Sequence, residues 1–501
     1  MKQWALLGTT ACVALLAGNA ALAEVTPQEV WDNWKALSTS YGQTMTVGSE
    51  ENDGETLTAT GIVITSEQDG AKATVTIDEA TITDGGDGTA VLTLSDVIKM
   101  EMTTAAVADM PAVTTKMSIT APGMETTVSG SAEEMTYDLA GETMTVKLDG
   151  IEGENAPSDL KIEAVLAGLA GQYVIGGSDA EKSVGSEFSA DSLALTFGGS
   201  NPEDGSKVAG TVNMANLTGA SDSTMIGDMT KLAEALKAGT AMEGNFAYES
   251  ASFDFNVTDA SGETKATGTN AGGDLTFAMD GGKLAYGGTA KDASFTISGG
   301  QIPFPQVNLA YKEGAFNLLM PVAKSDTPAD FGFMMKLADL TISDDIWNMI
   351  DPGKQLPRDP MTVHLDTTGK LKLTTDLMDE AAMANLQGSP GELHALDIKA
   401  LQVKLAGADL TGTGALTFDN SDLTTFAGVP APTGTIDLKA VGVNGLLDKL
   451  MAMGLVPEDQ MMGARMMLGM FAKVVEGQPD TMTSNVEFKN KGLFVNGMQL
   501  Q

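Results

Sequence analysis

Two histidines are the residues of this chain best suited to acid–base chemistry. Alternation along a strand would place His364 and Asp366 on one face, whereas His394 lies thirty residues further on. A catalytic base of this kind needs a nucleophile, and the chain contains no G-x-S-x-G sequence. We therefore interpret His364 as a solvated strand residue and expect no catalytic residue.

Methionine is in excess, with 30 copies, and five of them fall in one predicted helix over residues 457–473. Soft thioether ligands select Cu(I), but copper sites usually add a histidine or cysteine, and none is near in the sequence. Apolar residues surround almost the whole helix, which is typical of core packing or of contact with another apolar surface. We predict an apolar groove formed by Met461, Met462, Met466, Met467, Met470 and Phe471.

Oxygen-rich segments are the other candidates for a cation site. Residues 84–88 and 50–54 are dense in Asp, Glu, Asn and Gly, but neither segment has the spacing of an EF-hand loop. We interpret both as glycine-containing hairpin turns. Gly412-Thr413-Gly414 lacks the third glycine of a dinucleotide-binding loop. The sequence therefore predicts no metal site and no cofactor.

The charge of the chain excludes one class of partner. Its 501 residues include 67 acidic and 29 basic residues, which gives a formal net charge of −38. Such a field repels phosphate backbones, and only two arginines occur, so we expect no nucleic-acid binding. We interpret Arg358 and Arg465 as structural ion-pair anchors. Acidic residues in turns and on outward strand positions favour solubility and protect sheet edges.

Residues 1–23 have the features of a secretory signal peptide. Lys2 precedes an apolar stretch, and Ala21-Leu22-Ala23 forms an A-x-A cleavage site before Glu24. We predict cleavage after Ala23 and export to the periplasm, with secretion as the alternative. Cleavage would remove Cys12, the one cysteine, and leave a chain without disulfides.

No later segment has the composition of a transmembrane span. Residues 160–177 come closest, but Lys161, Glu163 and Gln172 interrupt them. We expect no transmembrane segment once the signal peptide is removed.

The elements that must position these residues follow from hydrophobic periodicity. A capping box at Thr26 and Glu29 predicts a helix that ends near Gly42. The period then changes to two in segments such as 56–60, 74–78 and 90–94, which is typical of half-buried strands. Further helices are predicted over residues 226–238, 343–350, 376–387, 443–452 and 457–473. The fold class is therefore mainly β (β-rich α+β), with a long curved antiparallel sheet and a few packed helices.

Similar strand and helix patterns recur in the two halves of the chain. Residues 194–197 are followed by a second strand and by the helix at 226–238, and residues 415–418 are followed by the same order of elements. We predict two β-rich lobes, residues 24–240 and 241–501, related by duplication. Compositional similarity between alternating strands is the alternative interpretation.

The chain after residue 23 resembles a bacterial family called domain of unknown function 2125, most specifically from about residue 343 to residue 500. The resemblance rests on Trp31 and Trp34 near the start, and on residues 346–353, 356–360, 411–420, 454–457, 464–471 and 495–497. It implies an exported protein and no established activity or site residues. The pattern of alternating strands is also similar to that of AsmA-like envelope proteins, which have long curved sheets. Those proteins are associated with lipid traffic between bacterial membranes.

These observations lead to three functional hypotheses. The first is a non-catalytic periplasmic protein that binds a lipid or another amphiphile in an apolar groove of the sheet. The second is a structural or interaction protein of the cell envelope, with envelope proteins as partners. The third is a hydrolase that uses scattered acidic residues.

Overall fold

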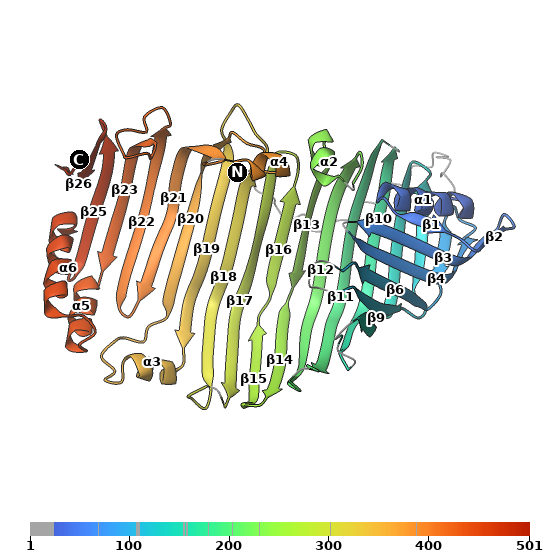
Figure 1. Cartoon of the computed structure of the whole chain (residues 1–501), viewed down its shortest axis with the longest axis horizontal. Helices are drawn as coiled ribbons and strands as arrows, with labels where there is room; N and C mark the ends of the chain where they lie inside the picture. The colour runs from blue at the N-terminus through green and yellow to red at the C-terminus, as the bar shows by residue number, and fades with distance from the viewer. Residues whose placement is uncertain are drawn as a thin grey trace, which may run out of the picture.

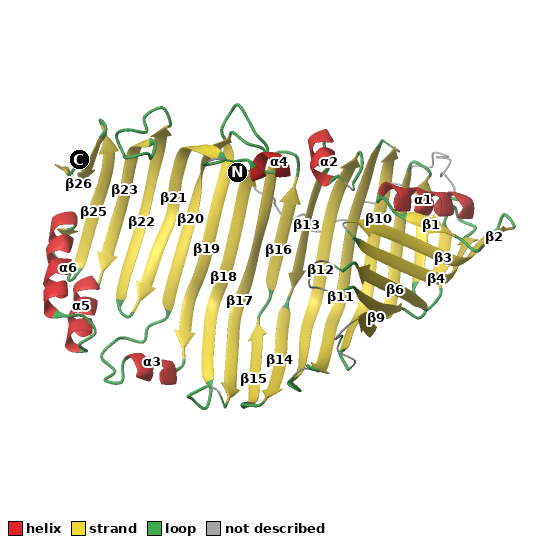
Figure 2. Cartoon of the chain, in the orientation of Figure 1, coloured by secondary structure: helices red, strands yellow, loops and turns green. Residues whose placement is uncertain are grey.

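The computed structural model describes residues 25–501 except 69, 107–110, 154, 155, 157, 158, 179, 203, 230, 301 and 387. The predicted signal peptide, with Cys12 and Ala23, lies outside the described residues. The described residues form a long, curved antiparallel sheet with short helices along its margins (Figures 1 and 2). The predicted mainly β fold is confirmed.

The N-terminal part of the sheet consists of short strands that pair with three longer ones, β3, β4 and β9. Its elements are α1 (Pro27–Ser40), β1 (Thr44–Thr46), β2 (Ser49–Asn52), β3 (Thr56–Gln68), β4 (Ala71–Asp84), β5 (Ala90–Leu94), β6 (Val97–Thr104), β7 (Val113–Thr120), β8 (Glu125–Ser131) and β9 (Glu134–Gly153).

The middle of the chain forms the longest strands. Its elements are β10 (Lys161–Ser178), β11 (Glu181–Ser200), β12 (Lys207–Ile226), α2 (Leu232–Ala238), β13 (Ala241–Tyr248), β14 (Ser250–Asp259), β15 (Gly262–Asn270), β16 (Gly273–Met279), β17 (Lys283–Gly299), β18 (Val307–Pro321) and β19 (Ala329–Ile342).

The C-terminal part continues the sheet and carries the remaining helices. Its elements are α3 (Asp344–Ile350), β20 (Met361–Leu373), α4 (Glu380–Ala384), β21 (Gly391–Leu405), β22 (Ala408–Asp419), β23 (Ala431–Val441), α5 (Val443–Ala452), α6 (Glu458–Phe471), β24 (Lys473–Val474), β25 (Thr481–Lys489), β26 (Gly492–Val495) and β27 (Met498–Gln499).

From β9 onward most strands pair with their neighbours in the sequence, so that the sheet is largely a meander. The order runs β9, β10, β11 and β12, and then from β17 through β23 to β25. Between β12 and β17 the strands are about half as long. β13 and β14 pair with different halves of β12, and β16 and β15 pair with different halves of β17. The sheet therefore continues across the predicted lobe boundary at residues 240 and 241, and the duplication stays a prediction.

A transverse crease crosses the strands from β10 to β19. The regular strand pairing is interrupted at Gly168 on β10, Asp191 on β11, Asn216 on β12 and Asp292 on β17. On β19 the register of pairing is again irregular beside Asp339. In the same line, single residues or pairs interrupt β13–β14 and β15–β16. Four of these residues have left-handed backbone conformations, with φ of 62° at Gly168, 51° at Asn216, 45° at Asp292 and 54° at Asp339. Bulges of this kind bend strands, and their alignment bends the whole sheet along one line.

The main core lies at the N-terminal end. Val30 and Trp31 of α1 are fully buried against β3 and β4, where Leu57, Ile62 and Ile82 are also inaccessible. The predicted capping box is confirmed, because the Thr26 side chain accepts from the backbone of Glu29 and the Glu29 carboxylate accepts from the backbone of Thr26. Local capping and apolar spacing therefore place α1 on the sheet.

The other predicted helices are confirmed, although α2, α3, α4 and α6 are shorter than predicted. Helix α2 begins only at Leu232, and the predicted first residue of this helix, Ile226, is the last residue of β12. Helix α4 begins only after Asp379, whose side chain caps it by accepting from the backbone N–H of Ala382. Helix α5 has the predicted bounds.

Candidate functional site

One row of paired residues crosses the sheet from β9 to β25 with almost entirely apolar side chains. Residues that pair across antiparallel strands point to the same face. The row consists of Leu139, Gly171, Phe188, Gly219, Phe246, Leu275, Gly288, Phe316, Met335, Leu365, Leu401, Gly412, Leu438 and Ser484. We call this face of β9–β25 the trough.

The next row along the same strands points to the opposite face and is largely polar. It consists of Asp138, Gln172, Glu187, Ala220, Asn245, Thr276, Gly287, Asn317, Met334, Asp366 and Ala400. In a sheet with water on both faces, both rows would be polar, so the difference marks the trough as an apolar surface.

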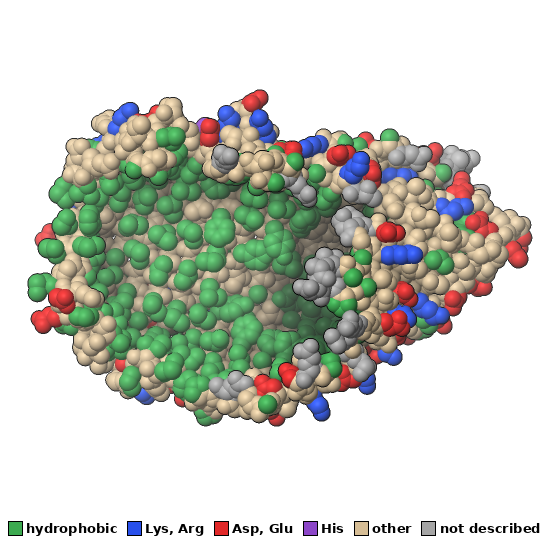
Figure 3. Space-filling view, in the orientation of Figure 1, with side chains coloured by type: hydrophobic (Ala, Val, Ile, Leu, Met, Phe, Trp, Pro, Cys, Tyr) green, Lys and Arg blue, Asp and Glu red, His purple; other side chains and the backbone are tan. Residues whose placement is uncertain are grey.

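The trough is hollowed, and its apolar side chains are open to solvent. Figure 3 shows this face toward the viewer, with hydrophobic side chains over most of the hollow. Phe316, Phe333 and Met335 are 38%, 42% and 46% exposed. Other members of the same face that are exposed to a similar extent are Ile162, Tyr173, Phe188, Val208, Val257, Leu275, Phe277, Tyr286, Val363 and Val403. A continuous exposed apolar surface of this extent is unusual for a soluble protein and indicates a binding surface.

Glycines let large side chains lie flat across the trough. Phe188 and Phe246 stack with ring centroids 6.3 Å apart, and Gly219 pairs with both. A Cβ atom at Gly219 would lie 2.1 Å from Cε1 of Phe188. The ring therefore occupies space that any other residue at this position would fill.

Helix α1 covers the N-terminal end of the same face. Tyr137 of β9 belongs to the trough, because it pairs with Tyr173, two residues from Gly171. Its hydroxyl donates to Oδ1 of Asn33 in α1 across 3.0 Å. The trough is thus closed by α1 over β9, whereas the strands beyond β10 present exposed apolar side chains.

The predicted groove residues lie at the C-terminal margin of the sheet. Met461 is buried, with 2% exposure, whereas Met462, Met466, Met467 and Met470 of α6 are all exposed. Phe471 is half-buried at the end of the helix. Met462, Met466 and Met470 follow one another at four-residue intervals and form a stripe along one side of α6. A groove at this helix stays a prediction.

The two histidines lie on neighbouring strands, β20 and β21. His364 and Asp366 lie on the polar face of β20, where they pair with Gln402 and Ala400. His394 lies on β21 with Nε2 3.4 Å from a carboxylate oxygen of Glu392. The two histidines therefore have separate surroundings.

The arginines are ion-paired, as predicted. Arg358 pairs with Asp344 at the start of α3 and donates to Oδ1 of Asn348 across 2.6 Å. Arg465 of α6 pairs with Asp448 of α5. Each arginine joins a helix to a neighbouring segment.

The oxygen-rich segments form turns that hydrogen-bond to themselves. Oδ1 of Asp84 accepts from the backbone N–H of Gly86, and Oδ1 of Asp87 accepts from the hydroxyl of Thr89. Likewise, Oδ1 of Asp53 accepts from the backbone N–H of Thr56. Within the described part of the chain, no group of three or more His, Cys, Asp or Glu side chains could hold a metal ion.

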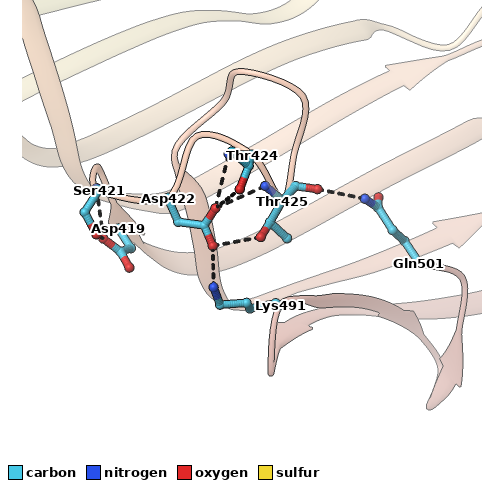
Figure 4. A network of polar contacts seen from close by, with 7 residues as sticks. All are labelled: Asp419, Ser421, Asp422, Thr424, Thr425, Lys491 and Gln501. Atoms are coloured by element: carbon cyan, nitrogen blue, oxygen red, sulfur yellow. Dashed lines mark hydrogen bonds and ion pairs between the residues drawn. The ribbon is translucent and has the colours of Figure 1, made fainter.

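A polar network ties the C-terminal end of the sheet together (Figure 4). Lys491 pairs with Oδ2 of Asp422 at 2.7 Å, and Thr424 and Thr425 donate to the same carboxylate. Gln501 donates to the backbone carbonyl of Thr425 across 3.0 Å. Hydrogen bonds from Lys491 and Thr425 hold the pKa of Asp422 well below its usual range. The network fastens the β22–β23 connection to the turn after β25.

A family model described as an uncharacterized protein conserved in bacteria, DUF2125, matches residues 234–500. The match covers more than half of the chain. The chain belongs to the DUF2125 family. In this DUF2125 protein the match begins within α2 and includes every strand from β13 to β27, and therefore most of the trough.

No curated protein and no solved structure is significantly similar to this DUF2125 chain. Among the helices that the structure describes, none is long and apolar enough to cross a membrane.

The alternation of apolar and polar residues was the sequence signal for the trough. It indicated which residues share a face, but not that this face would have no second layer over it.

Proposed function

We propose that this protein is an exported, non-catalytic binder of an uncharged or zwitterionic amphiphile, which it holds against the trough. The observation that carries the proposal is the contrast between neighbouring rows of the sheet. Phe316 and Met335 are exposed on the trough, whereas the adjacent Asn317 lies on the polar face. Covering the apolar row with acyl chains would remove it from water, which is favourable by roughly 25 cal/mol for each Å² covered.

The net charge supports a neutral rather than an anionic ligand. The chain has a formal charge of −38, so an anionic headgroup would approach against a repulsive field. Side chains of the trough row from Leu139 to Leu438 carry no charge that could offset this repulsion. A headgroup without net charge meets no such barrier.

Export is part of the proposal, because an apolar trough open to solvent suits a protein that works beside membranes. The signal-like residues 1–23 support it. Expression of the full chain in a Gram-negative host, followed by fractionation and N-terminal sequencing, tests this step. We expect a periplasmic product that begins at Glu24, and a cytoplasmic product that keeps Met1 would overturn it.

Binding is tested with N-phenyl-1-naphthylamine, an uncharged dye that fluoresces in apolar surroundings. We expect the dye to bind the full chain and to be displaced by monooleoylglycerol. Met335→Asp places a charge in the trough and should weaken dye binding about tenfold or more, because a buried charge is costly. Met334→Asp is the matched control on the opposite face and should bind the dye as the unchanged chain does.

Native mass spectrometry of the protein purified from its host adds a direct reading. A mass increment that corresponds to a co-purified lipid supports the proposal. Absence of dye binding, or an equal effect of the two methionine substitutions, contradicts it.

A further inference from the structure

An aromatic recess opens in the trough where the crease crosses β12, β14, β15, β17 and β18. It has a cavity volume of about 190 Å³, and its lining includes Val212, Phe253, Phe255, Phe295 and Tyr311. Phe253 stacks on Phe255 with ring centroids 4.7 Å apart, and Phe253 and Phe295 lie 6.0 Å apart. Phe295 in turn lies 5.9 Å from Tyr311. The recess is thus bounded by a chain of aromatic rings.

Glycine makes this arrangement of rings possible. Gly268 of β15 pairs with both Phe253 and Phe295. A Cβ atom at Gly268 would lie 2.3 Å from Cε1 of Phe253 and 3.0 Å from Cδ1 of Phe295. Any larger residue would therefore push these rings out of their present positions.

Besides the aromatic and aliphatic residues, the lining contains Ser252, Thr269 and Asn270, and Asn270 is the one with a buried polar atom that lacks a partner among the described residues. Asn270, the last residue of β15 before the crease, donates from Nδ2 to the hydroxyl of Tyr248 across 2.6 Å. Its Oδ1 is inaccessible to solvent and has no hydrogen-bond partner among the described residues. A buried amide oxygen without a partner is unfavourable, so a ligand that donates a hydrogen bond to it would gain more than an ordinary contact.

The size and the chemistry of the recess limit what it can hold. A dry apolar cavity of about 150 Å³ accommodates a benzene ring, so this recess suits one six-membered ring with a small substituent. Its aromatic walls favour a flat ring, and Oδ1 of Asn270 requires a donor. No charged side chain lines it, which favours an uncharged group.

We propose that the recess is the headgroup subsite of the trough and binds an uncharged amphiphile that ends in one hydroxylated ring, of the phenol or quinol class. The ring lies against the aromatic wall formed by Phe253, Phe295 and Tyr311, which contact one another. Its hydroxyl donates to Oδ1 of Asn270, and because this atom is inaccessible in the unliganded chain, the Asn270 side chain turns toward the ring when the contact forms. The apolar tail extends along the trough. This inference rests on the proposed function and specifies the ligand class.

Isothermal titration of the full chain with three probes tests the subsite. The probes are 4-propylphenol, 4-propylanisole and propylbenzene, which share one ring and one tail and differ in the donor. We expect 4-propylphenol to bind about tenfold more tightly than 4-propylanisole, because only the phenol can donate to Asn270. Equal affinities for these two probes would overturn the proposal.

Variants assign the effect to the recess. Asn270→Leu should remove the preference for the phenol and keep the binding of propylbenzene. Asn317→Leu, on the polar face, is the matched control and should keep the preference. If Asn270→Leu does not fold by circular dichroism, Gly268→Ala replaces it. That substitution should weaken all three probes alike, because it displaces the rings of Phe253 and Phe295.

The outcomes separate this inference from the proposed function. A preference for the phenol that persists in Asn270→Leu overturns the subsite. Failure of all three ring probes, together with normal binding of monooleoylglycerol, also overturns the subsite but leaves the trough as a binding surface. Failure of both the ring probes and monooleoylglycerol contradicts the proposed function itself.

Discussion

Tyr137 and Asn33 join the sheet to its N-terminal helix through a hydrogen bond of 3.0 Å, although 104 positions separate them in the chain. Tyr137 points to the trough face of β9, and Asn33 lies on α1. The contact holds α1 over one end of an otherwise exposed apolar surface. Helix α1 therefore serves both as the cover of the main core and as the closed end of the trough.

Removal of the Trp31 side chain should be strongly destabilising. Trp31 is fully buried in the core of α1, β3 and β4, and a Trp→Ala change at such a site costs about 3–5 kcal/mol. We expect Trp31→Ala to lower the free energy of unfolding of this end of the protein in urea titrations followed by circular dichroism. Thr39→Ala, at an exposed position of the same helix, is the control and should change the free energy by less than about 0.5 kcal/mol. Similar effects of the two variants would contradict the assigned core.

Stability should decrease at alkaline pH because of Tyr137. Burial raises the pKa of its hydroxyl above the ordinary value of about 10. The folded chain therefore holds this proton more tightly than the unfolded chain does. The contribution of the protonated Tyr137 hydroxyl to folding stability is complete below about pH 10 and is lost as the pH rises further. Thermal melts between pH 8 and 11 should show a steeper decline for the unchanged protein than for Tyr137→Phe. Equal declines for the unchanged protein and for Tyr137→Phe would contradict this assignment.

Acid should weaken the C-terminal network at Asp422. The pKa of its carboxyl is lowered in the folded chain, so the stabilisation is present above the ordinary value of about 4 and is lost as the pH falls toward the lower, folded value. Asp422→Asn should make unfolding of this end less sensitive to acid and should lower its melting temperature at neutral pH. Hydrogen exchange of β25 and β26 amides measures both effects. Asp459→Asn, in the exposed first turn of α6, is the control.

The two neighbouring methionines of α6 should respond differently to truncation. Met461 is 2% exposed, whereas Met462 is 67% exposed. We expect Met461→Ala to cost about 2–5 kcal/mol and Met462→Ala less than about 0.5 kcal/mol in urea unfolding. Equal costs would show that α6 packs in another orientation.

The crease should be sensitive to its glycine. Gly168 has a φ of 62°, and a Cβ atom there would lie 2.2 Å from Oδ2 of Asp191. Gly168→Val should therefore destabilise the sheet by about 1–3 kcal/mol in thermal or urea unfolding. Gly150→Ala, where no atom lies within 4 Å of the added carbon, is the control. A Gly168→Val variant as stable as the control would argue against strain at the crease.

Sequence periodicity predicted the elements well, because they depend on local patterns. The bounds of α5 and the capping box of α1 follow from residues close together in the chain.

The candidate site was harder to predict, because it depends on what covers a face. The same alternation suits a strand beneath a second layer and a strand open to solvent, so exposure of Phe333 could not be inferred from its neighbours. The partnerless Oδ1 of Asn270 depends on strands β14, β15, β17 and β18 meeting at one point of the crease. By contrast, the prediction of a groove at α6 was based on the number of methionines in this helix. Four of the five methionines are exposed to solvent, on a helix at the C-terminal margin of the sheet.

The meander has a consequence for how such a protein can change in evolution. Because each described strand from β18 to β22 pairs with the strand before it and the strand after it, this part of the body is nearly one-dimensional, like a solenoid of repeats. Adding or deleting a whole hairpin would change its length by about 10 Å and leave the remaining pairs intact. Relatives could therefore differ in length by whole hairpins and so accommodate molecules of different length, with no change of architecture.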